Sequence, residues 1–391
     1  MSKQIRVFDI RKKLLLPFIS LSFLIFGIGF GGLQLKLADI AQEFNLDYTA
    51  MGALVMMLYF GILSVSVISG YLGDKFGKKR VMVLAFILYI CGAMFAAFSR
   101  NVAGLYIGVY MIGLGAGMAE CAATAALSDS HPEKAIKKIN ISQGIYCAGY
   151  GVGPFAISAM VSAGAGWRVL FIAPAIIIIA LLPFLKTVEF TIREPKGGHK
   201  LESLPFFTLL RSKLLVLLLI GVLIYMGLEA GVTYFMDSFF TVELGQQEFS
   251  ATALTLFWFS MTLTRMIFGV INANTRIVVK LMTGITSVLL ALLSLSDHAN
   301  MAFVVCIITG FTLGTVWPML IGAATRRYSS NSGTVAGILM TGSGMGGMGI
   351  PVLMGVVADY VNLRWSMFML FLISIVAFVC CFLIFRDKEF R

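Results

Sequence analysis

The sequence has little charge. Lys, Arg, Asp and Glu together make up 13% of its 391 residues, whereas hydrophobic residues make up 59%. A soluble domain has roughly 25% charged residues, and its core could not bury this much apolar side chain. The scarcity of charge therefore excludes a soluble globular protein and predicts that lipid surrounds much of the chain.

Histidine and metal-ligating patterns are also scarce. The chain has three histidines, far apart in polar stretches, and six cysteines, which lie in apolar stretches without metal-ligand spacing. An enzyme needs a nucleophile paired with a base, and a metal site needs ligands at short, regular spacing. We therefore expect no enzymatic activity, no metal and no cofactor, and we interpret the cysteines as small hydrophobic residues.

Long apolar runs are abundant. A membrane helix needs about 20 apolar residues, and twelve stretches are long enough. They are approximately 14–38, 48–72, 81–99, 102–127, 138–163 and 167–187, then 213–240, 250–272, 276–296, 300–324, 333–358 and 364–386. A polar linker, 189–212, separates the sixth run from the seventh. The sequence predicts an all-α membrane protein with an N-terminal unit, 1–188, and a C-terminal unit, 213–391.

The two units share a pattern. Gly113-Leu-Gly-Ala-Gly117 in the first corresponds to Gly310-Phe-Thr-Leu-Gly314 in the second, at an offset of 310 − 113 = 197 residues. Pro154 and Pro351 are related by the same offset, 351 − 154 = 197, and we expect Pro154 to bend its helix. Internal repeats predict two pseudo-symmetric six-helix bundles with a site between them near the middle of the membrane. Transport of a small-molecule substrate is the leading hypothesis.

The net charge of +11 is unevenly distributed. Lys and Arg gather in the N-terminal segment and in the connections at 75–80, 134–138, 186–213 and 326–327, which all lie on one side of the membrane if both termini lie there. Because cytoplasmic loops carry the excess of Lys and Arg, we expect a multi-pass protein of the cell membrane with both termini in the cytoplasm. The positive charge thus indicates topology and not a nucleic-acid partner.

The connection between spans 2 and 3 reads Gly70-Tyr-Leu-Gly-Asp-Lys-Phe-Gly-Lys-Lys-Arg80. Gly70, Gly73 and Gly77 allow close helix approach and positive φ, and Asp74 can cap a helix N-terminus. This segment resembles the signature loop of the major facilitator superfamily, which implies the twelve-helix major facilitator fold. We expect Asp74 and Arg80 to close a cytoplasmic gate; a basic turn without special function is the alternative.

Three ionisable residues fall inside spans: Glu120, Glu229 and Arg265. Each costs roughly 2.5–3.5 kcal/mol at the centre of a membrane helix, so a functional role is the default interpretation. A carboxyl group in a poorly hydrated cavity suits proton coupling. We predict that Glu120 and Glu229 carry it, and that Arg265 either forms a gate contact or extends to the membrane surface.

Polar side chains also open span 5. Asn140, Gln143 and Tyr146 recur every three residues, so they lie roughly on one helical face. Amide and phenol groups both donate and accept hydrogen bonds, which suits a neutral polyhydroxylated ligand. Trp317 is the repeat equivalent of Glu120 (120 + 197 = 317) and is predicted to stack on a sugar ring; simple packing is the alternative.

These spans narrow the resemblance. Tyr225-x-Gly-x-Glu-x-Gly231 and Asn140-x-x-Gln143 are similar to spans 7 and 5 of the fucose–galactose–glucose:proton symporter family. The resemblance implies a proton-linked carboxylate in span 4, which Glu120 matches, and an acidic residue in span 1, where this chain has Gln34. A glutamine releases no proton. Either Glu229 takes over coupling, or coupling differs, or the chain is a facilitator.

The preferred hypothesis is proton-coupled symport of a small neutral polyhydroxylated solute, such as a monosaccharide, by a monomer. Gln34, Asn140, Gln143, Tyr146, Glu229 and Trp317 would bind it. Three alternatives stay open. The chain could export amphipathic drugs or lipids, or it could be a receptor that kept the carrier fold. It could also carry organic anions if Lys36 and Arg265 both face the cavity.

Overall fold

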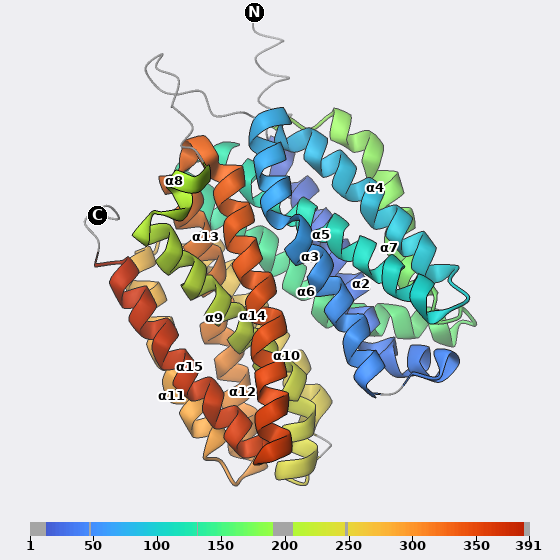
Figure 1. Cartoon of the computed structure of the whole chain (residues 1–391), viewed down its shortest axis with the longest axis vertical. Helices are drawn as coiled ribbons and strands as arrows, with labels where there is room; N and C mark the ends of the chain where they lie inside the picture. The colour runs from blue at the N-terminus through green and yellow to red at the C-terminus, as the bar shows by residue number, and fades with distance from the viewer. Residues whose placement is uncertain (1–12, 47, 131, 191–205, 247–248, 387–391) are drawn as a thin grey trace, which may run out of the picture.

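The computed structural model describes residues 13–46, 48–130, 132–190, 206–246 and 249–386, and within these ranges the chain is helical, without strands (Figure 1). The first bundle comprises α2 (Leu15–Phe44), α3 (Tyr48–Phe76), α4 (Lys78–Ala97), α5 (Val102–Ser130), α6 (Ala135–Ser162) and α7 (Val169–Leu181). After α8 (Phe206–Leu210), the second comprises α9 (Lys213–Ser238), α10 (Ser250–Val270), α11 (Thr275–Ser294), α12 (Ala299–Gly314), α13 (Val316–Arg327), α14 (Ser332–Tyr360) and α15 (Leu363–Ile384). The predicted all-α membrane fold is confirmed. Most of the predicted linker lies outside the described residues.

Among the described residues, eleven helical segments are long and apolar enough to cross a membrane, and α6 raises the number to twelve. The two parts of the span that contains α6, Pro132–Gly153 and Phe155–Ser162, meet at an angle of 41°. The bend falls at Pro154, where the sequence predicts it, because proline removes one helical hydrogen bond. Helices α12 and α13 together form one span, Ala299–Arg327, which is interrupted at Thr315.

The exposed side chains fit a lipid environment. In α11, Leu281, Ile285 and Val288 are exposed, whereas Thr283 and Thr286 are buried. This pattern is the reverse of a soluble amphipathic helix, in which the apolar stripe faces the core. The buried hydroxyls donate to the carbonyl oxygens of Val279 and Met282 in their own helix, so no donor is left unpaired at these positions.

The repeated glycines bring helices together within each bundle. A Cβ atom on Gly113 of α5 would collide with the Leu58 carbonyl of α3, and one on Gly310 of α12 would lie 2.5 Å from the Phe257 carbonyl oxygen of α10. Only glycine allows backbones this close. The repeat motif recognised in the sequence is therefore the same helix crossing made twice.

Matching ion pairs close each bundle at what we call the acidic end, where Glu43 and Glu243 lie. Arg168 Nη2 is 2.5 Å from Glu43 Oε1, and Arg364 Nε is 3.9 Å from Glu243 Oε2. The hydrogen bond from Arg168 holds the pKa of the exposed Glu43 carboxyl below its usual value. Each pair joins the first and last spans of one bundle, so the contact leaves the two bundles free to move relative to each other.

The bundles meet through α3 with α14 and through α6 with α10. Their contact is tightest at the opposite, basic end, which carries residues 75–80 and 326–327. There Asp74 accepts hydrogen bonds from Gly333 N at 3.0 Å and from Thr334 N at 2.7 Å. These are free N–H groups of the first turn of α14, so a carboxylate of one bundle caps a helix of the other.

Lys78 completes this contact. Its Nζ atom lies 2.5 Å from Asp129 Oδ2 and 3.3 Å from Asp74 Oδ1, and Ser332 Oγ donates to Asp129 Oδ1 at 2.8 Å. The sequence predicts Arg80 in the gate, but Arg80 is exposed. Lys78 is the cation that pairs with Asp74 and Asp129. The prediction for Arg80 is corrected accordingly. The sequence could not choose among three adjacent cations.

The signature glycines serve different purposes. A Cβ atom on Gly70 would collide with the backbone of Gly333, so this residue sets the crossing of α3 and α14. Gly77 has φ 95° at the N-cap of α4, a backbone conformation that glycine adopts without strain. Gly73 would tolerate a side chain, because the nearest atom is 3.5 Å from its ideal Cβ.

Substitution tests the repeated helix crossing. We expect Gly310→Ala to destabilise the protein by about 1–3 kcal/mol, because the new methyl group has no space beside the Phe257 carbonyl. Thermal unfolding in detergent measures the change. Gly349→Ala is the matched control, since nothing lies within 4 Å of its ideal Cβ; equal melting temperatures for the two variants would contradict the account.

A second substitution tests the contact at the basic end. Asp74→Asn keeps one acceptor oxygen but loses the charge and one oxygen acceptor, so we expect this end to open more often. Cys121, whose Sγ lies 3.6 Å from the Gly333 carbonyl oxygen, reports the opening. Its alkylation, followed by peptide mass spectrometry, should be roughly tenfold faster, which corresponds to about 1.4 kcal/mol.

Asp39→Asn is the control, because Asp39 pairs with Lys36 near the acidic end, with 2.9 Å between Nζ and Oδ2. It should leave the alkylation rate of Cys121 unchanged. A wild-type rate in the Asp74→Asn protein would show that the cap does not hold the bundles together.

Candidate functional site

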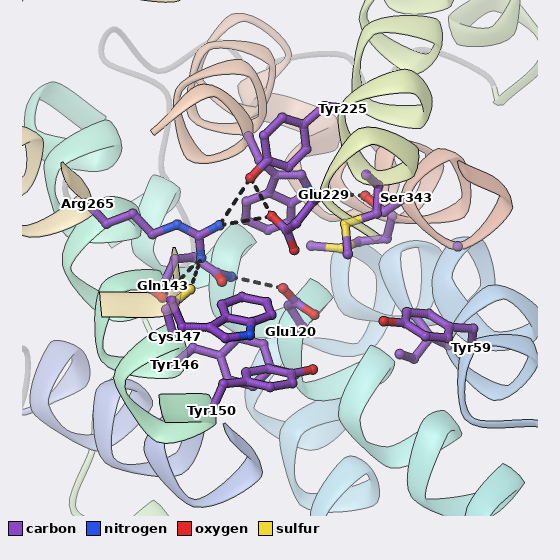
Figure 2. A pocket seen from close by; sticks show the side chains of 16 residues that line it. Tyr59, Glu120, Gln143, Tyr146, Cys147, Tyr150, Tyr225, Glu229, Arg265 and Ser343 are labelled. Atoms are coloured by element: carbon purple, nitrogen blue, oxygen red, sulfur yellow. Dashed lines mark hydrogen bonds and ion pairs between the residues drawn. The ribbon is translucent and has the colours of Figure 1, made fainter. Parts of the chain in front are cut away.

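A central cavity lies between the bundles, and many of its lining residues fall near the middle of their helices. Figure 2 shows these side chains around the cavity. Helices α3, α5 and α6 line it from the first bundle, and α9, α10, α13 and α14 from the second. The lining residues are Tyr59, Ile62, Glu120, Gln143, Tyr146, Cys147, Tyr150, Tyr225, Met226, Glu229, Trp258, Arg265, Trp317, Met340, Ser343 and Gly344. All three ionisable residues predicted from the spans are among them.

The lining is pseudo-symmetric in position but not in chemistry. Four pairs of lining residues differ by 197 in number, since 317 − 120, 340 − 143, 343 − 146 and 344 − 147 all equal 197. They are Glu120 with Trp317, Gln143 with Met340, Tyr146 with Ser343, and Cys147 with Gly344. The first bundle therefore presents an acid, an amide, a phenol and a thiol, and equivalent positions of the second present an indole, a thioether, a hydroxyl and a glycine.

Glu120 of α5 and Gln143 of α6 form the polar wall. Gln143 Nε2 donates to Glu120 Oε1 at 2.9 Å, and in Figure 2 the Glu120 carboxylate lies between Gln143 and Tyr59. Gln143 is buried, while Glu120 is partly open to the cavity. Among the described residues, no cation lies within ion-pair distance of Glu120. In the described part of the chain this carboxylate thus has a hydrogen-bond donor but forms no ion pair.

Arg265 of α10 crosses from one bundle to the other. Its Nη1 donates to the Gln143 carbonyl oxygen at 3.1 Å and to Cys147 Sγ at 2.9 Å, both in α6. Its Nη2 donates to the Tyr225 hydroxyl at 3.3 Å and lies 3.7 Å from Glu229 Oε2. Arg265 is only 4% exposed, so it does not extend to the membrane surface. The predicted alternative of a surface-directed arginine is wrong.

The broken tenth span supplies another acceptor for Arg265. A proline at position 318 has no N–H group, so the Gly314 carbonyl loses its usual donor four residues on. Arg265 Nε donates to this oxygen at 2.6 Å. The break between α12 and α13 is thereby joined to the charge network, and a buried carbonyl that would cost free energy if unpaired is satisfied.

Glu229 is paired within its own bundle. The Tyr225 hydroxyl, one turn earlier in α9, donates to Glu229 Oε2 at 2.5 Å, and Arg265 approaches the same oxygen. Glu229 is 6% exposed. The two carboxylates of the cavity therefore differ: Glu229 has a cation and a phenol, whereas Glu120 has an amide alone.

Aromatic side chains separate the central cavity from a second one nearer the acidic end. Tyr150 of α6 stacks on Trp258 of α10, with ring centroids 4.8 Å apart and an interplanar angle of 9°. Tyr59 and Tyr150 line both cavities, and Gln34 lines the second one. A solute entering from the acidic end would pass Gln34 before it reached this aromatic layer.

Two predicted binding residues lie elsewhere. Asn140 is fully buried outside the cavity lining, where its Oδ1 accepts from Thr315 Oγ1 at 2.7 Å and its Nδ2 donates to the Ile136 carbonyl at 2.9 Å. It joins α6 to the break in the tenth span and has no contact with the central cavity. Gln34 lines the second cavity only. Trp317 does line the central cavity, and its Nε1 donates to Ser343 Oγ at 3.0 Å.

Sequence reasoning missed several lining residues, above all Tyr59, Tyr150 and Trp258. Aromatic residues are common in membrane spans, where most face lipid. In α10 the run Phe257-Trp258-Phe259 holds two buried rings and one that is 42% exposed. Nothing in the run itself tells which ring faces the cavity, since the opposite surface of the helix is equally apolar.

Comparisons with known proteins agree with this architecture. A galactose-proton symporter of Escherichia coli (strain K12) is 33% identical over 115 residues, which cover 29% of this chain and 25% of that protein. A 4-hydroxybenzoate transporter, PcaK, of Pseudomonas putida is 27% identical over 172 residues, 42% of this chain and 38% of PcaK. The chain thus matches about a quarter to two fifths of the length of these curated relatives.

The fold has a solved counterpart. The crystal structure of the transporter FucP in the outward conformation superposes with a TM-score of 0.79 at 16% identity, covering 97% of this chain and 100% of FucP. The sequence profile of the Major Facilitator Superfamily matches residues 19–348 and 249–391. The chain therefore belongs to the Major Facilitator Superfamily and is a multi-pass membrane transporter, not an enzyme.

Proposed function

We propose that this transporter is a proton-coupled symporter of a small neutral polyhydroxylated solute, such as a monosaccharide. It would lie in the cell membrane with both termini in the cytoplasm and would work by alternating access. One observation carries the proposal: Glu120 faces the central cavity with an amide partner and, among the described residues, no cation within ion-pair distance.

The formal charges of the cavity residues provide a physical basis for coupling proton binding to solute binding. The cavity holds the carboxylates Glu120 and Glu229 and the guanidinium Arg265, so its formal charge is −1 when all three are ionised. An unpaired charge removed from water costs several kcal/mol. One proton on Glu120 makes the site neutral, and closure around the solute is then least costly. Proton binding and solute binding therefore favour the same closed state.

The same count favours a neutral solute. Arg265 is engaged by Glu229, Tyr225 and two backbone carbonyls, so its charge is already balanced. Lys36 pairs with Asp39 and is absent from the cavity lining. Amide, phenol and indole groups remain, and these suit hydroxyl groups and the apolar face of a sugar ring. The likeness to a galactose-proton symporter supports this class of solute.

The lining residues also fit alternating access. Both bundles contribute to the cavity, and the contact at the basic end rests on a few hydrogen bonds to the first turn of α14. A site between two repeats is exposed to one side and then the other when the repeats rock. Breaking the Asp74 contacts would open the cavity towards the basic end.

Organic-anion transport is the second candidate, because Arg265 lines the cavity and PcaK is a 4-hydroxybenzoate transporter. Binding an anion there would require the guanidinium to leave Glu229, or Glu229 to take up a proton as well. The proposal for a neutral solute needs neither step, and we therefore prefer it.

Glu120→Gln tests the coupling role. The amide has nearly the shape of a protonated carboxyl and can still accept from Gln143, so we expect sugar binding and sugar exchange to persist. Uphill accumulation driven by an inward proton gradient should be lost, with the inside-to-outside ratio falling to about one. Uptake of radiolabelled galactose, fucose, glucose and xylose into proteoliposomes measures both.

Glu133→Gln is the control, since Glu133 is an exposed acid beside the basic end. It should accumulate sugar like the wild type. Uphill accumulation by the Glu120→Gln protein would remove the proton role of Glu120. A wild-type protein that ignored all four sugars but transported 4-hydroxybenzoate would replace the proposal with the organic-anion carrier.

A further inference from the structure

Trp258 carries a hydrogen-bond donor without a partner. The side chain is 7% exposed and lines the central cavity, and its Nε1 is one of four buried side-chain N or O atoms that have no hydrogen bond in the described part of the chain. The other three are hydroxyl oxygens. An indole N–H can only donate, and a buried donor left unpaired costs about 1–3 kcal/mol.

The other tryptophans of the chain do not share this feature. Trp167 Nε1 donates to Glu43 Oε2 at 2.6 Å, and Trp317 Nε1 donates to Ser343 Oγ at 3.0 Å. Trp365 is 54% exposed. The unpaired donor is thus specific to the tryptophan in the aromatic layer, and its cost calls for an acceptor that the protein itself does not provide.

The Trp258 indole is held in place. Tyr150 stacks on it at 4.8 Å, and Phe257 packs edge-on with ring centroids 5.8 Å apart and an angle of 89°. Because two rings fix the indole, the N–H group cannot turn to another acceptor without breaking them apart. A donor fixed in advance loses little conformational entropy when it binds a ligand.

The other side-chain nitrogen donors of the cavity lining, and the Tyr225 hydroxyl, each have a partner. Gln143 donates to Glu120, Tyr225 to Glu229, and Trp317 to Ser343. Arg265 donates to two backbone carbonyls and a thiol, and also to Tyr225. Among the described residues of the lining, Trp258 Nε1 is thus the side-chain nitrogen without a partner, and it lies on the bundle opposite the Glu120 wall.

We propose that the Trp258 indole donates a hydrogen bond to a hydroxyl oxygen of the transported solute and so selects for a hydroxyl group at one position. The inference rests on the proposed sugar transport. It also gives the solute one partner in each bundle, Glu120 with Gln143 in the first and Trp258 in the second, so the solute itself bridges the bundles.

The test compares galactose with its five monodeoxy analogues, which lack the hydroxyl at C1, C2, C3, C4 or C6, by calorimetry on the purified 391-residue chain. In the wild type, one analogue should bind about tenfold more weakly than galactose. Trp258→Phe, which keeps an aromatic ring for Tyr150, should bind galactose about tenfold more weakly and should no longer distinguish it from that analogue. Loss of the distinction is a coupling that a merely structural role would not produce.

Two further variants serve as controls for the Trp258→Phe result. Trp258→His retains an N–H donor and should retain part of the distinction, whereas Trp365→Phe alters an exposed ring and should bind like the wild type. A Trp258→Phe protein with wild-type affinity for galactose would overturn the inference and leave the proposed function standing. An unchanged ranking of all five analogues in that variant would overturn it equally.

A second ligand distinguishes failure of the proposed sugar transport from failure of the donor role of Trp258. If the wild type binds 4-hydroxybenzoate instead of galactose, sugar transport is wrong, and the same variants are titrated with 4-hydroxybenzoate. A tenfold loss in Trp258→Phe would still support the donor role, and an unchanged affinity would overturn it. Binding of neither probe to the wild-type protein would overturn both proposals.

Discussion

A single buried cation organises the centre of this transporter. Arg265 is buried inside a membrane span, where an uncompensated charge is costly. A carboxylate, a phenol, a thiol and two carbonyls surround it and compensate its charge. One of those carbonyls is free because Pro318 breaks the tenth span. The cation thus links the broken span, the seventh span and the opposite bundle. In the described part of the chain it forms an ion pair with Glu229 and none with Glu120.

The two bundles share a backbone architecture but carry different side chains at equivalent positions of the cavity. Gly113 and Gly310 preserve the same helix crossing in both halves. At the cavity, equivalent positions have diverged, so that Glu120 corresponds to Trp317 and Gln143 corresponds to Met340. The backbone scaffold can remain pseudo-symmetric, as rocking between two states requires, while a proton acceptor stands on one side and an aromatic surface on the other.

Sequence alone predicted the twelve spans, the two bundles and the ionisable residues of the cavity, because these follow from hydrophobicity and from the rarity of charge in lipid. It placed Asn140 wrongly, since the spacing of polar residues gives a helical face but not which neighbour that face meets. Asn140 accepts a hydrogen bond from Thr315 and lies outside the cavity lining. Trp258 was not predicted because both surfaces of α10 are apolar. The hydrophobic pattern of this helix therefore does not distinguish a ring that faces the cavity from a ring that faces lipid.

We propose that Glu120 takes up the transported proton, because Arg265 pairs with Glu229 and not with Glu120. The proton-to-solute ratio tests this most directly, measured from the membrane potential that just cancels net sugar flux in proteoliposomes under a fixed proton gradient. The account predicts one proton for each neutral sugar. A ratio of two would show that Glu229 titrates as well, and a ratio of zero would show that the carrier is a facilitator; either result would contradict the charge balance described for the cavity.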